Sequence, residues 1–117
     1  QEVALADARR GIQMFRLDSF KVPIVGIVEN MAYFTPAELP DHKYYIFGRD
    51  GAKNLAQGMQ VPFLGSIPLV QGVCEAGDAG RPAVFQQNTP TTKAFEELVH
   101  NFETELNAII ATCKNPA

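Results

Sequence analysis

The residues best placed to do chemistry follow two apolar runs of the sequence. Asn30 comes shortly after the run 22–28, and Pro68 and Leu69 come directly after the run 61–67. An Asn amide can donate and accept hydrogen bonds at once, which suits the N6/N7 edge of adenine. A turn centred on proline can add carbonyl oxygens and an apolar wall for a flat ring. The alternative is that Asn30 only caps a turn and Pro68 only ends a strand.

Other chemistry-bearing motifs are missing from the sequence. Neither G-x-x-x-x-G-K-[ST] nor G-x-G-x-x-G occurs, and the glycines around residue 50 predict a tight turn before a helix. His42 and His100 do not form a spaced ligand set, and neither cysteine has a C-x-x-C partner. The serines have no base near them in the sequence, so a nucleophilic triad is not supported. We therefore assign no metal ligand and no catalytic residue.

Helices and strands must position the two candidate groups. Helices are expected where apolar residues recur at helical spacing, at 1–16, 52–59, 69–76 and 90–110. Strands are expected at 22–28, at 61–67 and, as a short one, at 83–85. The last helix would have Thr89 as its N-cap and Pro90 at its first position. The segment 30–48 mixes turn-forming and aromatic residues and is expected to be a loop.

The two main strands resemble each other. V-P-I-V-G-I-V at 22–28 matches V-P-F-L-G-S-I at 61–67, and each run follows an amphipathic helix. This predicts an α/β fold with two successive steps of a parallel sheet, the strands lying side by side or one strand apart. Ligands of open α/β sheets bind outside the carboxyl ends of the strands, so Asn30 and Pro68 would face one crevice. A sheet this small is a poor core, which suggests further strands upstream.

The composition excludes several classes of protein. The chain has 117 residues, 46% of them hydrophobic and 20% charged, which is typical of one globular domain. The net charge is −3, with ten basic residues scattered along the chain, so nucleic acid and membrane surfaces are not expected partners. No apolar run approaches the roughly 20 residues that a membrane span needs. Cys74 and Cys113 cannot form a disulfide framework; we expect them to be buried, in a reducing, cytoplasmic compartment.

Five segments occur in an order that a known family shares. They are Q-E-V-A-L-A-D-A-R-R-G at 1, G-I-V-E-N-M-A-Y-F at 26, I-F-G-R-D-G-A at 46, V-P-F-L-G-S-I-P-L at 61 and E-A-G-D-A-G-R-P at 75. In this order they resemble the C-terminal part of the Mrp/ApbC family. These are P-loop ATPases of the MinD and nitrogenase-iron-protein superfamily, implicated as carriers of iron–sulfur clusters. The resemblance covers essentially the whole chain and implies a three-layer, Rossmann-like fold with a parallel sheet.

The resemblance also implies what surrounds the chain. Residues 1–117 would be the C-terminal portion of a single P-loop ATPase domain, with the phosphate-binding lysine loop and magnesium-binding aspartates upstream. This chain alone should then be inactive, while the parent protein binds ATP with magnesium and hydrolyses it. Asn30 matches the adenine-contacting Asn of the family, and Ile67, Pro68 and Leu69 match the turn that flanks the base. Iron–sulfur client proteins and a homodimer, or other self-association, are the expected partners.

The chain departs from the family pattern at one position. Many members carry C-P-x-C after the Asn-Met-x-x-Phe run, whereas this sequence has Thr35, Pro36, Ala37 and Glu38. Iron–sulfur clusters are held by Cys thiolates, so a [4Fe–4S] cluster is doubtful here. Two other functions stay open: a non-enzymatic αβ interaction module that uses its aromatic loop, and a MinD/ParA-like positioning ATPase. The latter is disfavoured because the last helix has few basic residues.

Overall fold

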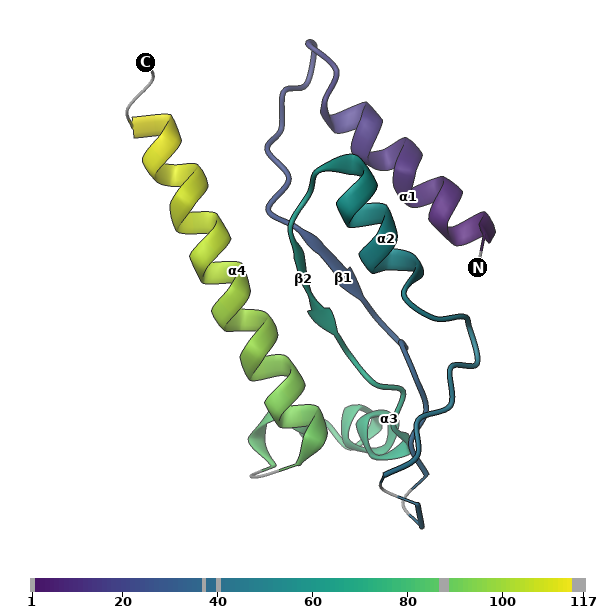
Figure 1. The fold of residues 1–117 in the computed structure, drawn as a ribbon. Coiled ribbons are helices and arrows are strands. Elements are labelled where there is room, and N and C mark those ends of the chain that lie inside the picture. The colour runs from purple at the N-terminus through teal and green to yellow at the C-terminus, as the bar shows by residue number, and fades with distance from the viewer. Residues whose placement is uncertain (1, 37, 40, 87–88, 115–117) are drawn as a thin grey trace.

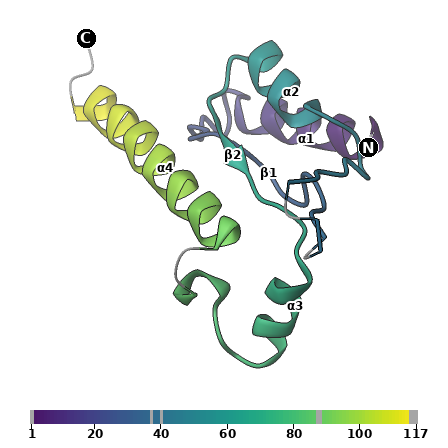
Figure 2. The ribbon, with the colours of Figure 1, turned by 60° about the horizontal axis from the view of Figure 1, so that its bottom comes forward.

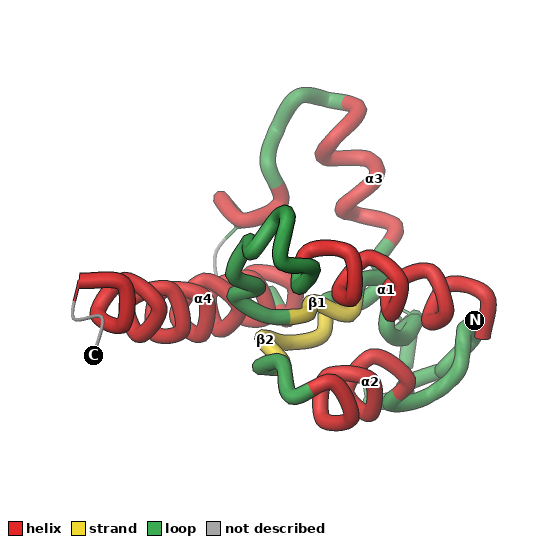
Figure 3. Tube along the Cα trace, turned by 90° about the horizontal axis from the view of Figure 1, so that it is seen from above, coloured by secondary structure: helices red, strands yellow, loops and turns green. Residues whose placement is uncertain are grey.

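The computed structural model describes residues 2–36, 38–39, 41–86 and 89–114. The elements in chain order are α1 (Glu2–Phe15), β1 (Ile27–Glu29), α2 (Gly51–Met59), β2 (Phe63–Ser66), α3 (Gln71–Asp78), the 3₁₀ helix η1 (Ala83–Phe85) and α4 (Pro90–Lys114). Figures 1 and 3 show α4 on one side of the strand pair and α1 on the other, with α2 against both strands. The architecture is α/β with a small parallel sheet, as expected.

The strands β1 and β2 are neighbours and run parallel. Ile27 pairs with Phe63 at one end of the ladder, and Glu29 pairs with Ser66 at the other. The pairing continues past the strands, because the Leu69 amide donates to the Tyr33 carbonyl oxygen at 2.7 Å. The side-by-side arrangement of the two predicted strands is therefore confirmed, and their carboxyl ends lie at the same edge.

Both strands are shorter than the apolar runs that predicted them. Residues 22–26 belong to no strand, and in the described part of the chain β1 has β2 as its only neighbour in the sheet. Pro62 has no amide to donate, although its carbonyl oxygen accepts from the Ile27 amide at 2.9 Å. Hydrophobicity identified the right segments, but a ladder forms only where a second strand is within reach.

The core lies where α2 packs on the strands. The buried apolar residues of the described chain are Ile12, Ala32, Leu55, Ala56, Val61, Leu64, Ile67 and Ala76, the last of them on α3 and away from this core. The glycine at position 26 is needed for this packing, because a Cβ built there would lie 2.4 Å from Leu64 Cγ. A side chain at Gly26 would therefore force the Leu64 side chain or the backbone to move.

Two expectations about the second half of the chain are wrong. The segment 83–85 is a 3₁₀ helix and not a strand, because it is tied to the start of α4. The Thr92 hydroxyl lies 2.5 Å from the carbonyl oxygen of Gln86 and 3.3 Å from that of Ala83. The predicted N-cap is confirmed, since Thr89 Oγ1 accepts from the Thr92 amide at 3.0 Å.

The second error concerns the cysteines, which were expected to be buried. Both are free and exposed, Cys74 on α3 and Cys113 near the end of α4. Figure 2 shows why: α3 stands apart from the strands, and the C-terminal end of α4 projects away from them.

Among the described residues, no helix is long and apolar enough to cross a membrane.

Candidate functional site

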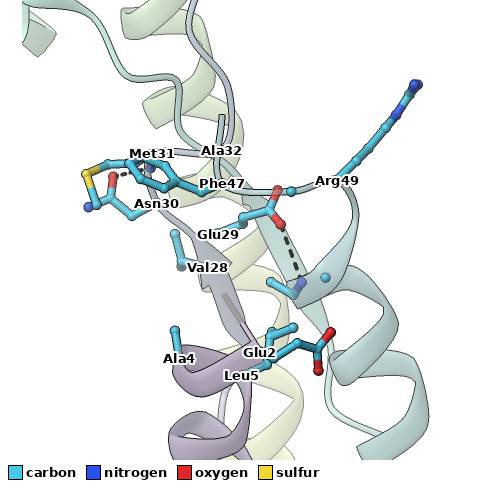
Figure 4. A pocket seen from close by; sticks show the side chains of 13 residues that line it. Glu2, Ala4, Leu5, Val28, Glu29, Asn30, Met31, Ala32, Phe47 and Arg49 are labelled. Carbon is cyan, nitrogen blue, oxygen red and sulfur yellow. Dashed lines mark hydrogen bonds between the residues drawn. The ribbon is translucent and has the colours of Figure 1, made fainter. Parts of the chain in front are cut away.

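A hollow of about 330 Å³ lies at the carboxyl end of β1 (Figure 4). Three structural segments surround it. Its wall includes Glu29, Asn30 and Met31 from the strand end, Glu2 and Leu5 from α1, and Arg49 and Ala52 from the start of α2. In Figure 4 the Arg49 side chain points away from the hollow, whereas the Glu29 carboxylate points toward the first turn of α2.

Asn30 is exposed at this hollow, and the oxygen of its side-chain amide already accepts a hydrogen bond. Its Oδ1 accepts from the Met31 amide at 3.0 Å, and Met31 adopts a left-handed conformation with φ 54°. This is the turn-capping role that the sequence left open as an alternative. Within the described residues the Asn30 Nδ2 makes no hydrogen bond, so the side chain remains able to donate to a ligand.

Glu29, one residue earlier, joins three elements. Its Oε1 accepts from the Ser66 hydroxyl at 3.2 Å, and its Oε2 accepts from the Ala52 amide at 3.4 Å. The N-cap residue of α2, Asp50, makes no side-chain capping bond, so Glu29 satisfies one of the free amides of that helix from a distant position. Sequence reasoning missed this residue. The only signal was an acidic residue at the end of an apolar strand.

The turn after β2 is mostly committed to the protein itself. The Ile67 side chain is 5% exposed, its amide donates to the Glu29 carbonyl at 2.8 Å, and its carbonyl accepts from the Ala32 amide at 2.9 Å. The Leu69 amide donates to the Tyr33 carbonyl oxygen. Leu69 lines neither this hollow nor a second cavity beside it. Of the three residues predicted here, Pro68 is the one with a surface that opens into a cavity.

Asn30 and Pro68 open into different cavities. Their backbone segments run side by side, as the crevice argument expected. However, Pro68 lines a second cavity, together with Thr35, Val73 and Thr91, and Asn30 does not. The structure thus brings the two predicted segments together without joining their side chains in one hollow.

The loop between the strand end and α2 is held by an antiparallel bridge. Phe34 and Tyr44 exchange two backbone hydrogen bonds of 2.8 Å each. On the loop, Lys43 Nζ lies 4.6 Å from the ring centroid of Tyr33, and Arg49 Cζ lies 4.8 Å from that of Tyr45. Cations at this range are attracted to aromatic rings. The sequence pattern did not indicate that basic residues lie over these rings.

The position of the family's cysteine pair carries no cysteine in this chain. Thr35 and Pro36 are half-buried, Glu38 is exposed, and Ala37 lies outside the described residues. The two cysteines are on separate helices, Cys74 on α3 and Cys113 on α4. In the part of the chain that the structure describes, no group of three His, Cys, Asp or Glu residues is arranged to hold a metal ion.

Comparison with known proteins identifies the family. The model of the ParA family, described as NUBPL iron-transfer P-loop NTPase, matches residues 1–103. The chain is 47% identical over 87 residues to the iron-sulfur cluster carrier protein of Synechocystis sp., covering 74% of this chain and 24% of that protein. It is 39% identical over 110 residues to the iron-sulfur cluster transfer protein NUBPL of Dictyostelium discoideum, covering 93% and 33%.

A third relative shows the same partial overlap. The iron-sulfur cluster carrier protein of Deinococcus radiodurans is 51% identical over 87 residues, covering 73% of this chain and 23% of that protein. The chain therefore spans about a quarter to a third of the length of these relatives. The family match over residues 1–103, together with the parallel αβ steps, shows that this chain belongs to the ParA family of NUBPL-type iron-transfer P-loop NTPases.

Proposed function

We propose that this chain is the nucleotide-base-binding half of an Mrp-type ATP-binding protein that takes part in iron–sulfur cluster assembly or transfer. The observation that carries the proposal is Asn30 at the carboxyl edge of a parallel sheet, an exposed amide whose Nδ2 makes no hydrogen bond to any residue that the structure describes. In a P-loop NTPase this edge is where ligands bind. The three-layer fold of the complete domain, with residues 1–117 as its C-terminal portion, belongs to the same proposal.

In this proposal the chain binds and orients the base. Asn30 donates from Nδ2 to a ring nitrogen of adenine, while its Oδ1 stays on the Met31 amide and fixes the side-chain rotamer. Pro68 supplies an apolar wall nearby, and Ile67 and Leu69 hold that turn through their backbone bonds. The chain has no phosphate-binding glycine loop, so magnesium, the phosphates and hydrolysis are assigned to the full-length protein.

The cluster is cargo in this proposal, and this chain supplies no ligand for it at positions 35–38. The hydroxyl of Thr35, the ring of Pro36 and the carboxylate of Glu38 do not replace two thiolates. Iron–sulfur client proteins and a homodimer complete the proposal. Exposed apolar side chains on several elements, such as Val3 at 76%, favour contact with further protein surface. Two exposed free thiols fit a reducing compartment such as the cytoplasm.

The test is calorimetry of ATP binding to the full-length protein. Asn30→Ala should weaken binding by about 1–3 kcal/mol, the range for an unmade buried hydrogen bond. Asn54→Ala, on the exposed side of α2, is the matched control and should bind like the wild type. If N7 of adenine accepts the hydrogen bond from Asn30, the wild type should bind 7-deaza-ATP more weakly than ATP. Asn30→Ala should bind the two nucleotides equally. Unchanged ATP affinity in Asn30→Ala would refute the base-contact role.

A further inference from the structure

The start of α2 depends on a residue that lies far from it in the sequence. Asp50, directly before the helix, has a left-handed conformation with φ 59° and makes no side-chain capping bond. A first-turn amide, that of Ala52, donates instead to Glu29 Oε2, on a residue 23 positions earlier in the chain. Helix N-termini favour anionic acceptors, because their first amides are unpaired and the helix dipole is positive there. The Glu29 carboxylate therefore helps to fix where α2 begins.

Glu29 is held on β2 as well. Its Oε1 accepts from the Ser66 hydroxyl at 3.2 Å, and its backbone carbonyl oxygen accepts from the Ile67 amide at 2.8 Å. Both the side chain and the backbone of this half-buried residue are thus bound to other elements. We call the bonds of the Glu29 carboxylate to Ala52 and Ser66 the Glu29 clamp.

The Glu29 clamp joins two sides of the hollow in Figure 4. Asn30, at the strand end, and Ala52, at the start of α2, both line this hollow. Along the chain they are separated by the loop 30–50, and a long loop by itself leaves its two ends free to shift relative to each other. Packing of α2 on both strands places the helix as a whole, and the clamp adds a polar contact at its first turn. The position of Asn30 relative to that turn therefore depends on Glu29.

We propose that Glu29 is a positioning residue for the nucleotide base, an inference that rests on the proposed base contact of Asn30. Glu29 does not touch the base. It holds the strand end that carries Asn30 and the first turn of α2 in one arrangement, so that Asn30 Nδ2 is directed at its acceptor before the ligand binds. A group fixed in advance loses less conformational freedom on binding, which strengthens the contact. Loss of the Glu29 clamp should therefore weaken ATP binding through Asn30.

The test is a double-mutant cycle, with ATP binding to the full-length protein measured by calorimetry. Glu29→Ala should weaken ATP binding by about two- to thirty-fold in the wild-type background. It should cause no further loss in the Asn30→Ala background, because no amide is left there to position. Glu103→Ala, exposed on α4, is the acidic control and should bind ATP like the wild type. Equal losses in the two backgrounds, or no loss in the wild-type background, would overturn the proposal.

Two milder variants decide the question if Glu29→Ala does not fold. Glu29→Gln should bind ATP like the wild type, because its amide oxygen can accept from Ala52 and its amide nitrogen can donate to the Ser66 hydroxyl. Ser66→Ala removes one bond of the clamp and should give a smaller loss than Glu29→Ala, again only where Asn30 is present. A Ser66→Ala loss of the same size in the Asn30→Ala background would contradict the positioning role.

The cycle also separates this inference from the proposed function. If Asn30→Ala weakens ATP binding and Glu29→Ala adds its full loss on top, only the positioning role of Glu29 fails. If Asn30→Ala binds ATP like the wild type, the base contact itself fails, and the positioning role fails with it.

Discussion

The strongest structural prediction concerns Glu29, whose carboxylate joins β1, β2 and α2. Glu29→Ala removes the acceptor for the Ser66 hydroxyl at 3.2 Å and for the Ala52 amide at 3.4 Å. Losing a helix N-cap interaction costs about 0.5–2 kcal/mol, and losing one further hydrogen bond about 0.5–1.5 kcal/mol. Both bonds are long and Glu29 is only half-buried, so we expect a total loss of stability of about 1–3 kcal/mol.

Urea unfolding followed by circular dichroism measures this loss. Glu2→Ala is the matched control, because Glu2 lines the same hollow and makes no hydrogen bond among the described residues. Its change should stay within about 0.5 kcal/mol, as for most surface substitutions. In a double-mutant cycle, Glu29→Ala and Ser66→Ala should couple by about 0.5–1.5 kcal/mol. A Glu29→Ala protein as stable as the Glu2→Ala control would refute the bridging role.

Two other predictions test the packing of the sheet and the second half of the chain. Gly26→Ala should destabilise the protein by about 1–3 kcal/mol, because its Cβ would meet Leu64; Gly58→Ala, with open space around it, should be neutral or stabilising. Thr92→Val should cost about 1–3 kcal/mol by leaving the Gln86 carbonyl without its donor. In both experiments urea unfolding is the measurement, and a Gly26→Ala or Thr92→Val protein as stable as the wild type would contradict the contact named.

The local elements followed from the sequence because their causes are local. Helical periodicity placed α1, α2, α3 and α4 to within a few residues, and the Thr89 cap was read from its position before Pro90. The paired apolar runs gave the parallel neighbours. Strand length could not be predicted, because it depends on where a second strand lies within hydrogen-bonding reach.

The segment 83–85 failed for a similar reason. Its sequence of small and apolar residues fits a strand, but the segment closes as a 3₁₀ turn, in which the Phe85 amide donates to the Pro82 carbonyl oxygen at 3.1 Å. The Thr92 hydroxyl adds contacts with the carbonyl oxygens of Ala83 and Gln86. The cysteines were placed by residue type, which predicts burial, whereas their exposure results from helices that stand clear of the sheet. Residue type predicts the average burial of a cysteine, and these two cysteines depart from it because of where their helices lie.

The sequence by itself determined the family, the order of the αβ steps and the missing cysteine pair at positions 35–38, since these depend only on which residues follow one another. The tertiary structure alone decided how the side chains meet. It brought the Glu29 carboxylate to the first turn of α2 and to Ser66 of β2. It also separated Asn30 and Pro68 into two cavities. Such contacts depend on side-chain direction across distant segments, which spacing along the chain does not specify.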